Sequence, residues 1–225
     1  MLRLASSSPR RVQLLTLLDV PFESSAPDVD EERVASPARA KADAVARPGE
    51  VTLAADTLID ADGDRLGKPA DESHAIAMLA TLSGREHEVR TDVVIIAASG
   101  ARKEFAVRSR VTLRELTLRQ IERYVATGEP LGKAGAYAIQ GEGRRLVESY
   151  RGCLANITGL PLCHVYFALR GVGVVPRERP EAVCQAHFAF ACPVWRAAQR
   201  QGRALRDGAE FRSWSEDVSG ALLGR

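Results

Sequence analysis

Carboxylates in two separate segments form the first candidate centre of chemistry. One segment holds Asp28, Asp30, Glu31 and Glu32, and the other places Asp56 directly after an apolar run. Carboxylates from two such segments can jointly hold a hard divalent cation that bridges phosphate oxygens. A solvated acidic loop is the alternative for the first segment, and we prefer it for Glu32. It explains Asp56 less well, because an aspartate among apolar neighbours is costly to bury without a partner.

Lysine usage gives a second signal, because arginine heavily outnumbers lysine. The remaining lysines are Lys41, Lys68, Lys103 and Lys133. Such residues are candidates for positions that need a compact ammonium on a flexible stem instead of a planar guanidinium. Lys68 and Lys133 each follow a glycine, where the backbone can approach a ligand closely. Taken singly, each is equally well explained as a surface loop lysine.

The segment from Ser6 to Arg11 combines hydroxyls, backbone donors and two guanidinium groups. It follows a predicted strand and opens a predicted helix, an arrangement that suits a chain of phosphates. On this segment alone, an ordinary helix cap with solvated arginines is the preferred interpretation.

Histidines and cysteines contribute less. Cys184, His187 and Cys192 could begin a zinc site, but a fourth ligand is lacking and the spacing matches no strong template. Buried thiols and a packing histidine are favoured instead. The remaining histidines lack partners that would support catalysis, and we predict structural or surface roles for them: His74, His87 and His164.

Strands and helices alternate along the chain and must position these groups. Apolar periodicity, caps and turn residues predict strands over 2–5, 51–59, 89–98 and 105–113, and helices over 9–18, 32–46 and 117–126. The helix over 32–46 is predicted to be broken at Ser36-Pro37. Asp62-Gly63 predicts a hairpin turn, and Asp71 is the predicted cap of a further helix. The predicted fold class is therefore α/β.

The amino-acid composition of the chain changes near residue 176. Pro176 and Pro180 flank a charged stretch, and no lysine follows. We therefore predict a main domain over 1–175 and a mostly helical extension over 176–225. Trp195 and Trp214 are available to dock this extension on the main domain.

Composition excludes several classes of protein. The formal charge of +2 comes from 31 basic and 29 acidic residues in mixed order, so no basic stripe for nucleic acid is expected. No segment is apolar for long enough to span a bilayer. Asp19 and Pro21 cut short the only apolar run that resembles a signal peptide, so we expect a cytoplasmic protein.

Six short motifs occur in order along the chain: ASSSPRR (5–11), ADT (55–57), GKP (67–69), LSGR (82–85), KAGAYAIQG (133–141) and GLPL (159–162). Together they resemble the Maf family of nucleoside triphosphate pyrophosphatases, and the resemblance covers residues 2 to about 171. The resemblance implies an α/β fold of the inosine triphosphatase type, with two lobes around a long mixed sheet and the nucleotide in the cleft between them.

The same resemblance assigns expected roles. Asp56 matches the proton acceptor that activates water, and Asp30 with Glu31 matches an acidic pair that holds Mg²⁺ or Mn²⁺ together with Asp56. The groups expected around the triphosphate are Ser6, Ser8, Arg11, Lys41 and Lys68, with Lys68 counted among the catalytic residues. Lys133 is a further candidate for substrate binding.

Three positions separate a dTTP and UTP subgroup of this family from a 7-methyl-GTP subgroup. Here they are Arg10, Thr57 and Gln140, the pattern of the first subgroup. A glutamine amide donates and accepts together, which matches the O4 and N3–H edge of a pyrimidine.

The resemblance implies hydrolysis of dTTP, UTP and related pyrimidine nucleotides to the monophosphate and pyrophosphate, by attack of water on the α-phosphorus. A homodimer is a family-level expectation. One alternative is a non-catalytic nucleotide-binding regulator of cell division and septum formation. Another is a pyrophosphatase directed at purines or 7-methyl-GTP.

Overall fold

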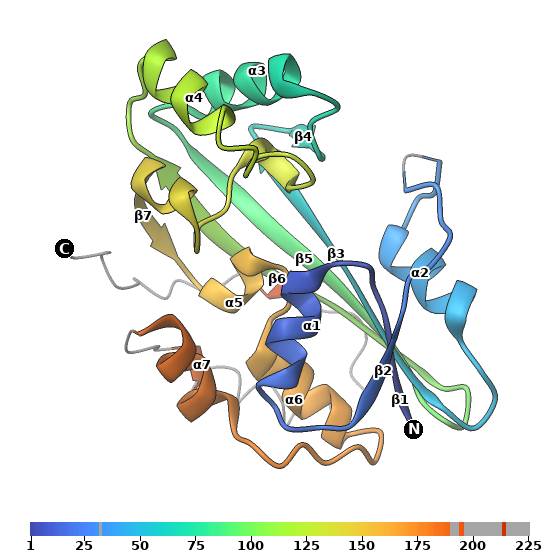
Figure 1. The fold of residues 1–225 in the computed structure, drawn as a ribbon. Coiled ribbons are helices and arrows are strands. Elements are labelled where there is room, and N and C mark those ends of the chain that lie inside the picture. Colours follow the sequence, from blue (N-terminus) through green and yellow to red (C-terminus); the bar gives the residue numbers. More distant parts are fainter. Residues whose placement is uncertain (32, 190–193, 196–212, 215–225) are drawn as a thin grey trace.

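The computed structural model describes residues 1–31, 33–189, 194–195 and 213–214. Its centre is a mixed sheet of strand order β2-β1-β3-β5-β6-β7, in which β4 also pairs with β3 and β8 with β6 (Figure 1). The strands are β1 Leu2–Ala5, β2 Phe22–Ser25, β3 Val51–Ala61, β4 Asp64–Leu66, β5 Glu86–Ile96, β6 Arg102–Leu113, β7 Val147–Arg151 and β8 Ser213–Trp214.

Helices gather around both ends of the long strands. They are α1 Pro9–Thr16, α2 Pro37–Val45, α3 Glu72–Leu82, α4 Leu118–Val125, α5 Leu154–Thr158, α6 Leu162–Arg170 and α7 Pro180–Phe188, with 3₁₀ turns η1 Ala134–Ala136 and η2 Glu142–Leu146. In Figure 1, α3 and α4 lie with β4 around one end of the sheet, and α1, α6 and α7 lie around the other. Among the described residues, no helix combines the length and apolar character that crossing a bilayer requires.

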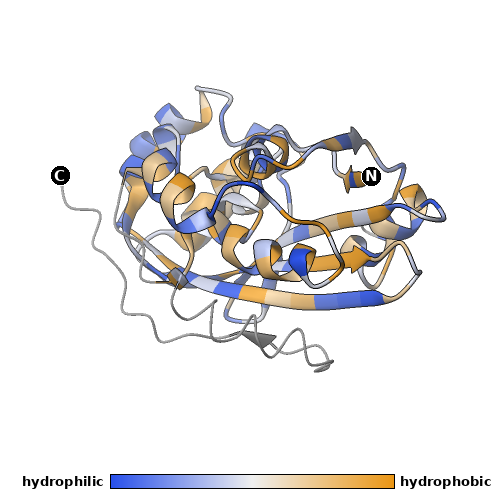
Figure 2. Ribbon diagram, turned by 90° about the horizontal axis from the view of Figure 1, so that it is seen from below, coloured by the Kyte–Doolittle hydropathy of each residue, from blue (hydrophilic) through white to orange (hydrophobic). Residues whose placement is uncertain are grey.

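Each of the two lobes has a large hydrophobic core of its own. The first packs Leu14 and Leu15 of α1 against Leu53, Ile95 and Phe105 of the sheet. The second joins α3 and α4 to later parts of the same strands, through Ile59, Leu79, Val111 and Ile121. Each such buried side chain contributes about 1.5–3 kcal/mol. In Figure 2, apolar colouring covers large parts of the central strands and of the helices that face them.

A gap in strand pairing opens one edge of β3. Strand β1 pairs with β3 in parallel only as far as Ala5 opposite Ala54. Strand β4 pairs with the same edge only from Ile59 onward. On its other edge, β3 pairs with β5 without a break from Thr52 to Asp60. Residues 55–58 are therefore held firmly on one side and reachable on the other.

The predicted α/β fold, with two lobes around a long mixed sheet, is confirmed. The hairpin turn at Asp62-Gly63 is present, and the Asp71 carboxylate caps α3 by accepting from the His74 backbone N–H. Thr117 and Gln120 form a complete capping box at the start of α4.

Two predicted elements differ from the observed ones near the site. Of the helical stretch predicted over 32–46 with a break at Ser36-Pro37, the structure shows a helix only from the break onward, starting at Pro37. Ser36 is extended (φ −139°, ψ 92°), because proline disfavours a helical residue before it. The strand predicted to end at Ile59 runs on to Ala61, so Asp56 lies within β3 and not near its end. Its accessibility comes from the pairing gap instead.

The predicted extension begins with a helix, α7, that packs against the main body. Cys184 of α7 and Val194 belong to the first core. The Trp195 ring stacks on Phe167 with centroids 5.3 Å apart, so the predicted docking of Trp195 is confirmed. The Trp214 side chain lies outside the described residues, and the domain boundary near 176 stays a prediction.

Candidate active site

A cleft of about 1150 Å³ opens beside the pairing gap in β3. Its wall combines the start of α1, the loop before α2, the centre of β3 and the segments around β4 and η1. Every site residue predicted from the sequence lines it: Ser6, Ser8, Arg10, Arg11, Asp30, Glu31, Lys41, Asp56, Thr57, Lys68, Lys133 and Gln140. The fold thus brings together groups that are up to 134 positions apart (140 − 6) in the chain.

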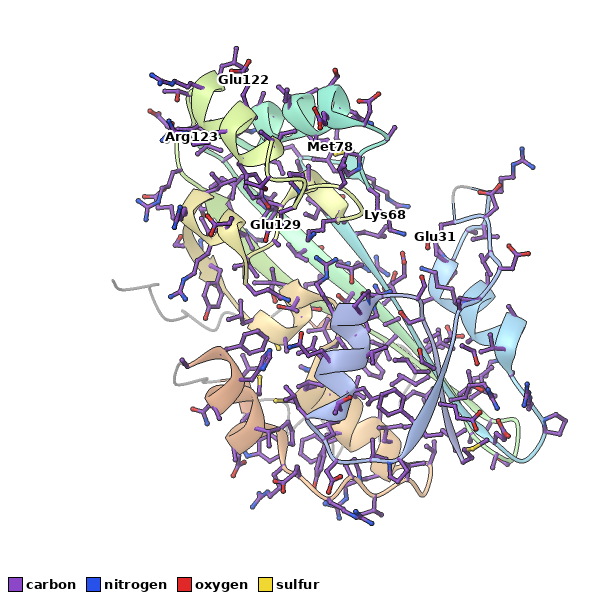
Figure 3. The ribbon with its side chains drawn as sticks, viewed as in Figure 1. Glu31, Lys68, Met78, Glu122, Arg123 and Glu129 are labelled. Carbon is purple, nitrogen blue, oxygen red and sulfur yellow. The ribbon has the colours of Figure 1, made fainter. Side chains whose placement is uncertain are left out.

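Two carboxylates and two ammonium groups form one connected chain in this cleft. The Lys41 Nζ lies 2.6 Å from Asp56 Oδ1 and 3.0 Å from Glu31 Oε1. The Lys68 Nζ lies 3.1 Å from Glu31 Oε2, and both side chains are labelled in Figure 3. Lys41 and Asp56 are buried, whereas Lys68 is exposed. A buried pair of this kind is costly to break on one side only, because an uncompensated charge remains.

Glu31 is held in its ionised form. Burial alone raises the pKa of its carboxyl, but hydrogen bonds and charges from Lys41 and Lys68 outweigh this effect and lower the pKa. Asp30 is exposed, and its Oδ2 lies 3.1 Å from Arg33 Nε. Asp30 also lines the cleft, and its role as a metal ligand stays a prediction.

Arg11 ties the start of α1 to the sheet. Its Nε donates to the Gly159 carbonyl at 2.9 Å, and its Nη2 donates to Thr57 Oγ1 at 3.1 Å. Burial lowers the pKa of Arg11, and the nearby Asp56 charge partly offsets this. Thr57 Oγ1 also lies 3.0 Å from Thr91 Oγ1, so the side chain of Thr57 is fixed from two directions.

The serine loop shapes the entrance to α1. Ser6 is buried, and its Oγ accepts from the Ser8 backbone N–H at 3.1 Å. Ser8 is the N-cap residue, but its side chain makes no capping hydrogen bond. The first turn of α1 thus lies on the cleft wall without a side-chain cap, and such a helix start suits an anionic oxygen.

Arg10, Lys133 and Gln140 lie on the cleft wall from opposite lobes. Burial lowers the pKa of Arg10, and nearby Tyr124 and Glu129 partly offset the shift. The Lys133 Nζ donates to the Glu129 backbone carbonyl. Within the part of the chain that the structure describes, no side-chain hydrogen bond involves Arg10 or Gln140. Their polar groups are therefore available to a ligand.

The donors suit a cation that is shared with a phosphorylated ligand. Over residues 1–31, 33–189, 194–195 and 213–214, no group of three or more His, Cys, Asp or Glu residues is placed to hold a metal alone. Mg²⁺, however, usually takes one or two carboxylates and completes its shell with phosphates and water. Two carboxylates of the cleft, those of Glu31 and Asp56, share one ammonium, and their role as metal ligands stays a prediction.

The hypothesis of a zinc site at Cys184, His187 and Cys192 gains no support from the described residues. Cys184 lies in the first core, and the His187 ring packs edge-on against Phe188 at 4.7 Å between centroids. Cys192 lies outside the described residues.

Sequence reasoning missed the residues that support the site from behind. Thr91 Oγ1 donates to the Asn156 carbonyl at 3.1 Å and braces Thr57. Tyr124 and Glu129 accept hydrogen bonds from the backbone of the segment that carries Gln140. Nothing in the sequence marks Thr91 within its strand, whereas Glu129, an acidic residue between glycine and proline, offered a weak turn signal.

Fold and cleft define a two-lobed α/β protein with a charged cleft suited to a polyanion. The chain belongs to the family of Maf-like proteins, whose sequence model matches residues 1–172. A dTTP/UTP pyrophosphatase of Anaeromyxobacter dehalogenans (strain 2CP-1) is 44% identical over 79% of this chain and 97% of its own length. Those of Myxococcus xanthus and Moorella thermoacetica are 45% and 46% identical, over 77% and 76% of this chain and 93% and 94% of their own.

One solved structure shows a more distant similarity. It is a nucleoside-triphosphatase, or dITP/XTP pyrophosphatase, of Mycobacterium abscessus, with 19% identity and a TM-score of 0.34. The match covers 50% of this chain and 73% of the other. This similarity is too limited to support a conclusion about the site.

Proposed function

We propose that this protein hydrolyses dTTP, UTP and related pyrimidine nucleoside triphosphates to the monophosphate and pyrophosphate. The names of relatives 44–46% identical to it support this reaction. The observation that carries the proposal is that Asp56, Lys41, Glu31 and Lys68 form one chain of charges in the same cleft as Gln140. Groups for triphosphate chemistry and groups for base recognition therefore share one site.

In the proposed reaction, the oxygen of a water molecule attacks the α-phosphorus, and Asp56 takes a proton from that water. A new P–O bond forms, the bond from the α-phosphorus to the bridging oxygen breaks, and pyrophosphate leaves. Lys68 and Arg11 offset the charge that develops on the phosphate oxygens. The first turn of α1 binds a further phosphate oxygen through backbone N–H groups.

Glu31 and Asp56 are the proposed carboxylates for Mg²⁺ or Mn²⁺, with Asp30 as a further candidate. When bound, such a cation neutralises phosphate charge and lowers the pKa of a bound water. The Lys41 ammonium lies between the two carboxylates, so binding of a cation there and the contacts of Lys41 are coupled.

Base recognition is assigned to Gln140, Arg10 and Thr57. The Gln140 amide both donates and accepts, as the O4 and N3–H edge of uracil or thymine requires. Ser6, Ser8 and Lys133 complete the proposed contacts to the substrate from the walls of the cleft.

The test is a panel of purified nucleoside triphosphates with Mg²⁺ or Mn²⁺, in which monophosphate, pyrophosphate and orthophosphate are measured separately. We expect dTTP and UTP to be the best substrates, with pyrophosphate as the first product. Orthophosphate as the first product would place the attack on another phosphorus and overturn the mechanism. Preference for 7-methyl-GTP or a purine would overturn the base assignment.

The alternative that this protein is a non-catalytic regulator of cell division is not favoured, because the relatives of this chain bear the names of enzymes. The proposal includes a division of the chain into a main domain over 1–175 and an extension over 176–225. It also includes a cytoplasmic location, a homodimer, and the absence of nucleic-acid and membrane partners. Sedimentation of the purified protein tests the dimer.

A further inference from the structure

Glu129 stands behind the wall of the cleft that carries the proposed base-recognition residue. It lies in the loop between α4 and η1, is half-buried, and does not line the cleft itself (Figure 3). No role in the proposed reaction uses it. Its hydrogen bonds, however, connect it to the segment that carries Gln140, which lines the cleft.

The Glu129 carboxylate collects three donors. Its Oε2 accepts from the Tyr124 hydroxyl at 2.8 Å and from the Gly143 backbone N–H at 2.9 Å. Its Oε1 accepts from the Glu142 backbone N–H at 3.2 Å. Two of these donors belong to the turn that directly follows Gln140. The position of that turn therefore depends on the carboxylate.

Tyr124 fixes the same segment on the other side of Gln140. Its hydroxyl oxygen accepts from the Ala138 backbone N–H at 3.1 Å while its proton goes to Glu129. Gln140 thus sits between two anchored points, Ala138 and Glu142, and both anchors lead to the Glu129 carboxylate.

The packing leaves little freedom for this arrangement. A Cβ added at Gly141 would lie 1.8 Å from Glu129 Oε1. A Cβ added at Gly143 would lie 2.6 Å from the Tyr124 hydroxyl oxygen and 2.8 Å from the Ala138 carbonyl. Glycine at both positions lets the backbone close around the Tyr124–Glu129 pair, and this fixes the direction in which Gln140 leaves the turn.

Glu129 also contacts a second residue of the cleft wall through its backbone. Its carbonyl accepts from Lys133 Nζ. Burial lowers the pKa of Arg10, on α1 in the other lobe, and Tyr124 and Glu129 partly offset this shift. Within the described part of the chain, the hydrogen bonds of the Glu129 carboxylate go to Tyr124 and to the turn after Gln140, and none goes to Lys41 or Lys68.

We propose that Glu129 is a specificity-determining positioning residue, which holds Gln140 in place for the nucleobase and leaves binding of the triphosphate unaffected. This inference rests on the proposed function. It predicts that loss of the carboxylate weakens recognition of the base, whereas contacts to the phosphates remain.

The test compares a ligand that has a base with one that lacks it. The probes are α,β-imido-UTP, which is not cleaved at the α-phosphorus, and inorganic tripolyphosphate, with affinities measured by calorimetry in the presence of Mg²⁺. In Glu129→Gln, one acceptor oxygen becomes an NH₂ group that faces backbone N–H donors. We expect affinity for the UTP analogue to fall about tenfold or more, because a lost hydrogen bond then leaves donors unpaired. Affinity for tripolyphosphate should stay within about twofold.

The matched control is Glu122→Gln, which removes an exposed carboxylate from α4 near the same loop. It should change neither affinity. Tyr124→Phe removes one donor to Glu129 and the acceptor for Ala138 but keeps the Glu129 charge. It should weaken the UTP analogue selectively and to a smaller extent, and it carries the test if Glu129→Gln fails to fold.

Other results would overturn the inference. Equal weakening of both probes would mean that Glu129 only supports the cleft as a whole, and unchanged affinity for both would remove it from recognition altogether. Failure of the proposed function is distinguishable, because it appears as absence of UTP and dTTP hydrolysis in the unaltered protein. The selective loss of the UTP analogue is measured without turnover.

Discussion

Asp56 lies at a point where the sheet is paired on one edge and open on the other. Its backbone is held by β5, and its carboxylate is held by Lys41 at 2.6 Å. Lys41 also contacts Glu31, so its ammonium keeps a carboxylate partner when Asp56 is changed. The two carboxylates are therefore not equivalent: Asp56 is buried and fixed, while Glu31 connects the buried lysine to the exposed one.

Asp56→Asn removes the proposed base with little change of shape. Because Lys41 keeps Glu31, we expect the variant to fold with a melting temperature within a few degrees of the unaltered protein. The rate constant kcat for UTP should fall by about 10²–10⁴-fold, the usual contribution of a positioned base. Steady-state kinetics and thermal unfolding measure both, with Asp64→Asn on exposed β4 as the control. Turnover at the original rate would remove Asp56 from the mechanism.

Gln140→Glu tests the direct contact to the base. A carboxylate only accepts, so the O4 oxygen of uracil or thymine would face negative charge. Loss of one hydrogen bond with an unpaired group typically costs about 1–3 kcal/mol, or roughly tenfold to a hundredfold in specificity. The same carboxylate can accept from the N1–H and N2 amino groups of guanine. We therefore expect kcat/KM for 7-methyl-GTP to rise relative to UTP.

Measurement of kcat/KM for dTTP, UTP and 7-methyl-GTP decides this prediction. An unchanged ratio would mean that Gln140 does not contact the base, and the pyrimidine assignment would lose its main physical support. Changing Arg10 and Thr57 in the same variant should enlarge the effect, since these two positions line the same cleft.

The residues that line the cleft were predictable because their types are unusual for their settings. An aspartate in an apolar strand and a lysine beside glycine both stand out in the sequence. Thr91 and Asn156 do not, because their importance comes from contacts with residues 34 and 67 positions away, such as Thr57 and Val89. Such long-range partners are not readable from one sequence.

At the scale of elements, local signals predicted where most helices and strands lie. Caps at Asp71 and Thr117 act through neighbouring backbone groups, so the sequence contains the whole cause. The end of β3 has a different cause, since its pairing with β4 and β5 carries the strand past Asp56 to Ala61. The pairing gap that exposes Asp56 is a property of three strands together and has no local signal.

The junction between β5 and η1 gives a pH-dependent prediction. His87 on β5 is buried, and its Nε2 lies 2.8 Å from the Tyr137 hydroxyl oxygen. Burial lowers the pKa of His87 to about 4, from 6.5 for an exposed histidine. Between these values the unfolded chain binds a proton that the folded protein excludes. The stabilising effect of neutral His87 is thus complete above pH 6.5 and is lost as the pH falls toward 4.

His87→Gln removes this titration and keeps a polar partner for Tyr137. We expect its free energy of unfolding to fall less between pH 7 and pH 4.5 than that of the unaltered protein. The difference should approach roughly 3 kcal/mol near pH 4, at about 1.4 kcal/mol per pKa unit. Denaturant unfolding at several pH values measures it, with exposed His74→Gln as the control. Parallel pH profiles for His87→Gln and the unaltered protein would contradict the prediction.

At the scale of the whole molecule, the described start of the extension forms part of the first lobe. The Trp195 ring stacks on Phe167 and meets Tyr166 edge-on at 6.0 Å, while the Arg179 guanidinium lies 5.5 Å from the Trp195 ring centre. Cys184 is buried in the same core. The described start of the extension therefore covers a side of α6 that the main domain leaves uncovered.

Truncation after residue 176 separates this packing role from catalysis. It removes Cys184, Val194 and Trp195, and each buried apolar side chain is worth about 1.5–3 kcal/mol, so stability should fall by several kcal/mol. Among the residues that the structure describes, every one that lines the cleft precedes residue 160, so the ratio of kcat/KM for dTTP to that for UTP should not change in the fraction that folds. Trp195→Ala in the full chain is the milder control and should lower stability only through loss of the Trp195 contacts with Phe167, Tyr166 and Arg179. A truncated, folded enzyme with a different base preference would mean that the extension reaches the cleft, and unchanged stability would mean that its packing on α6 contributes nothing to folding.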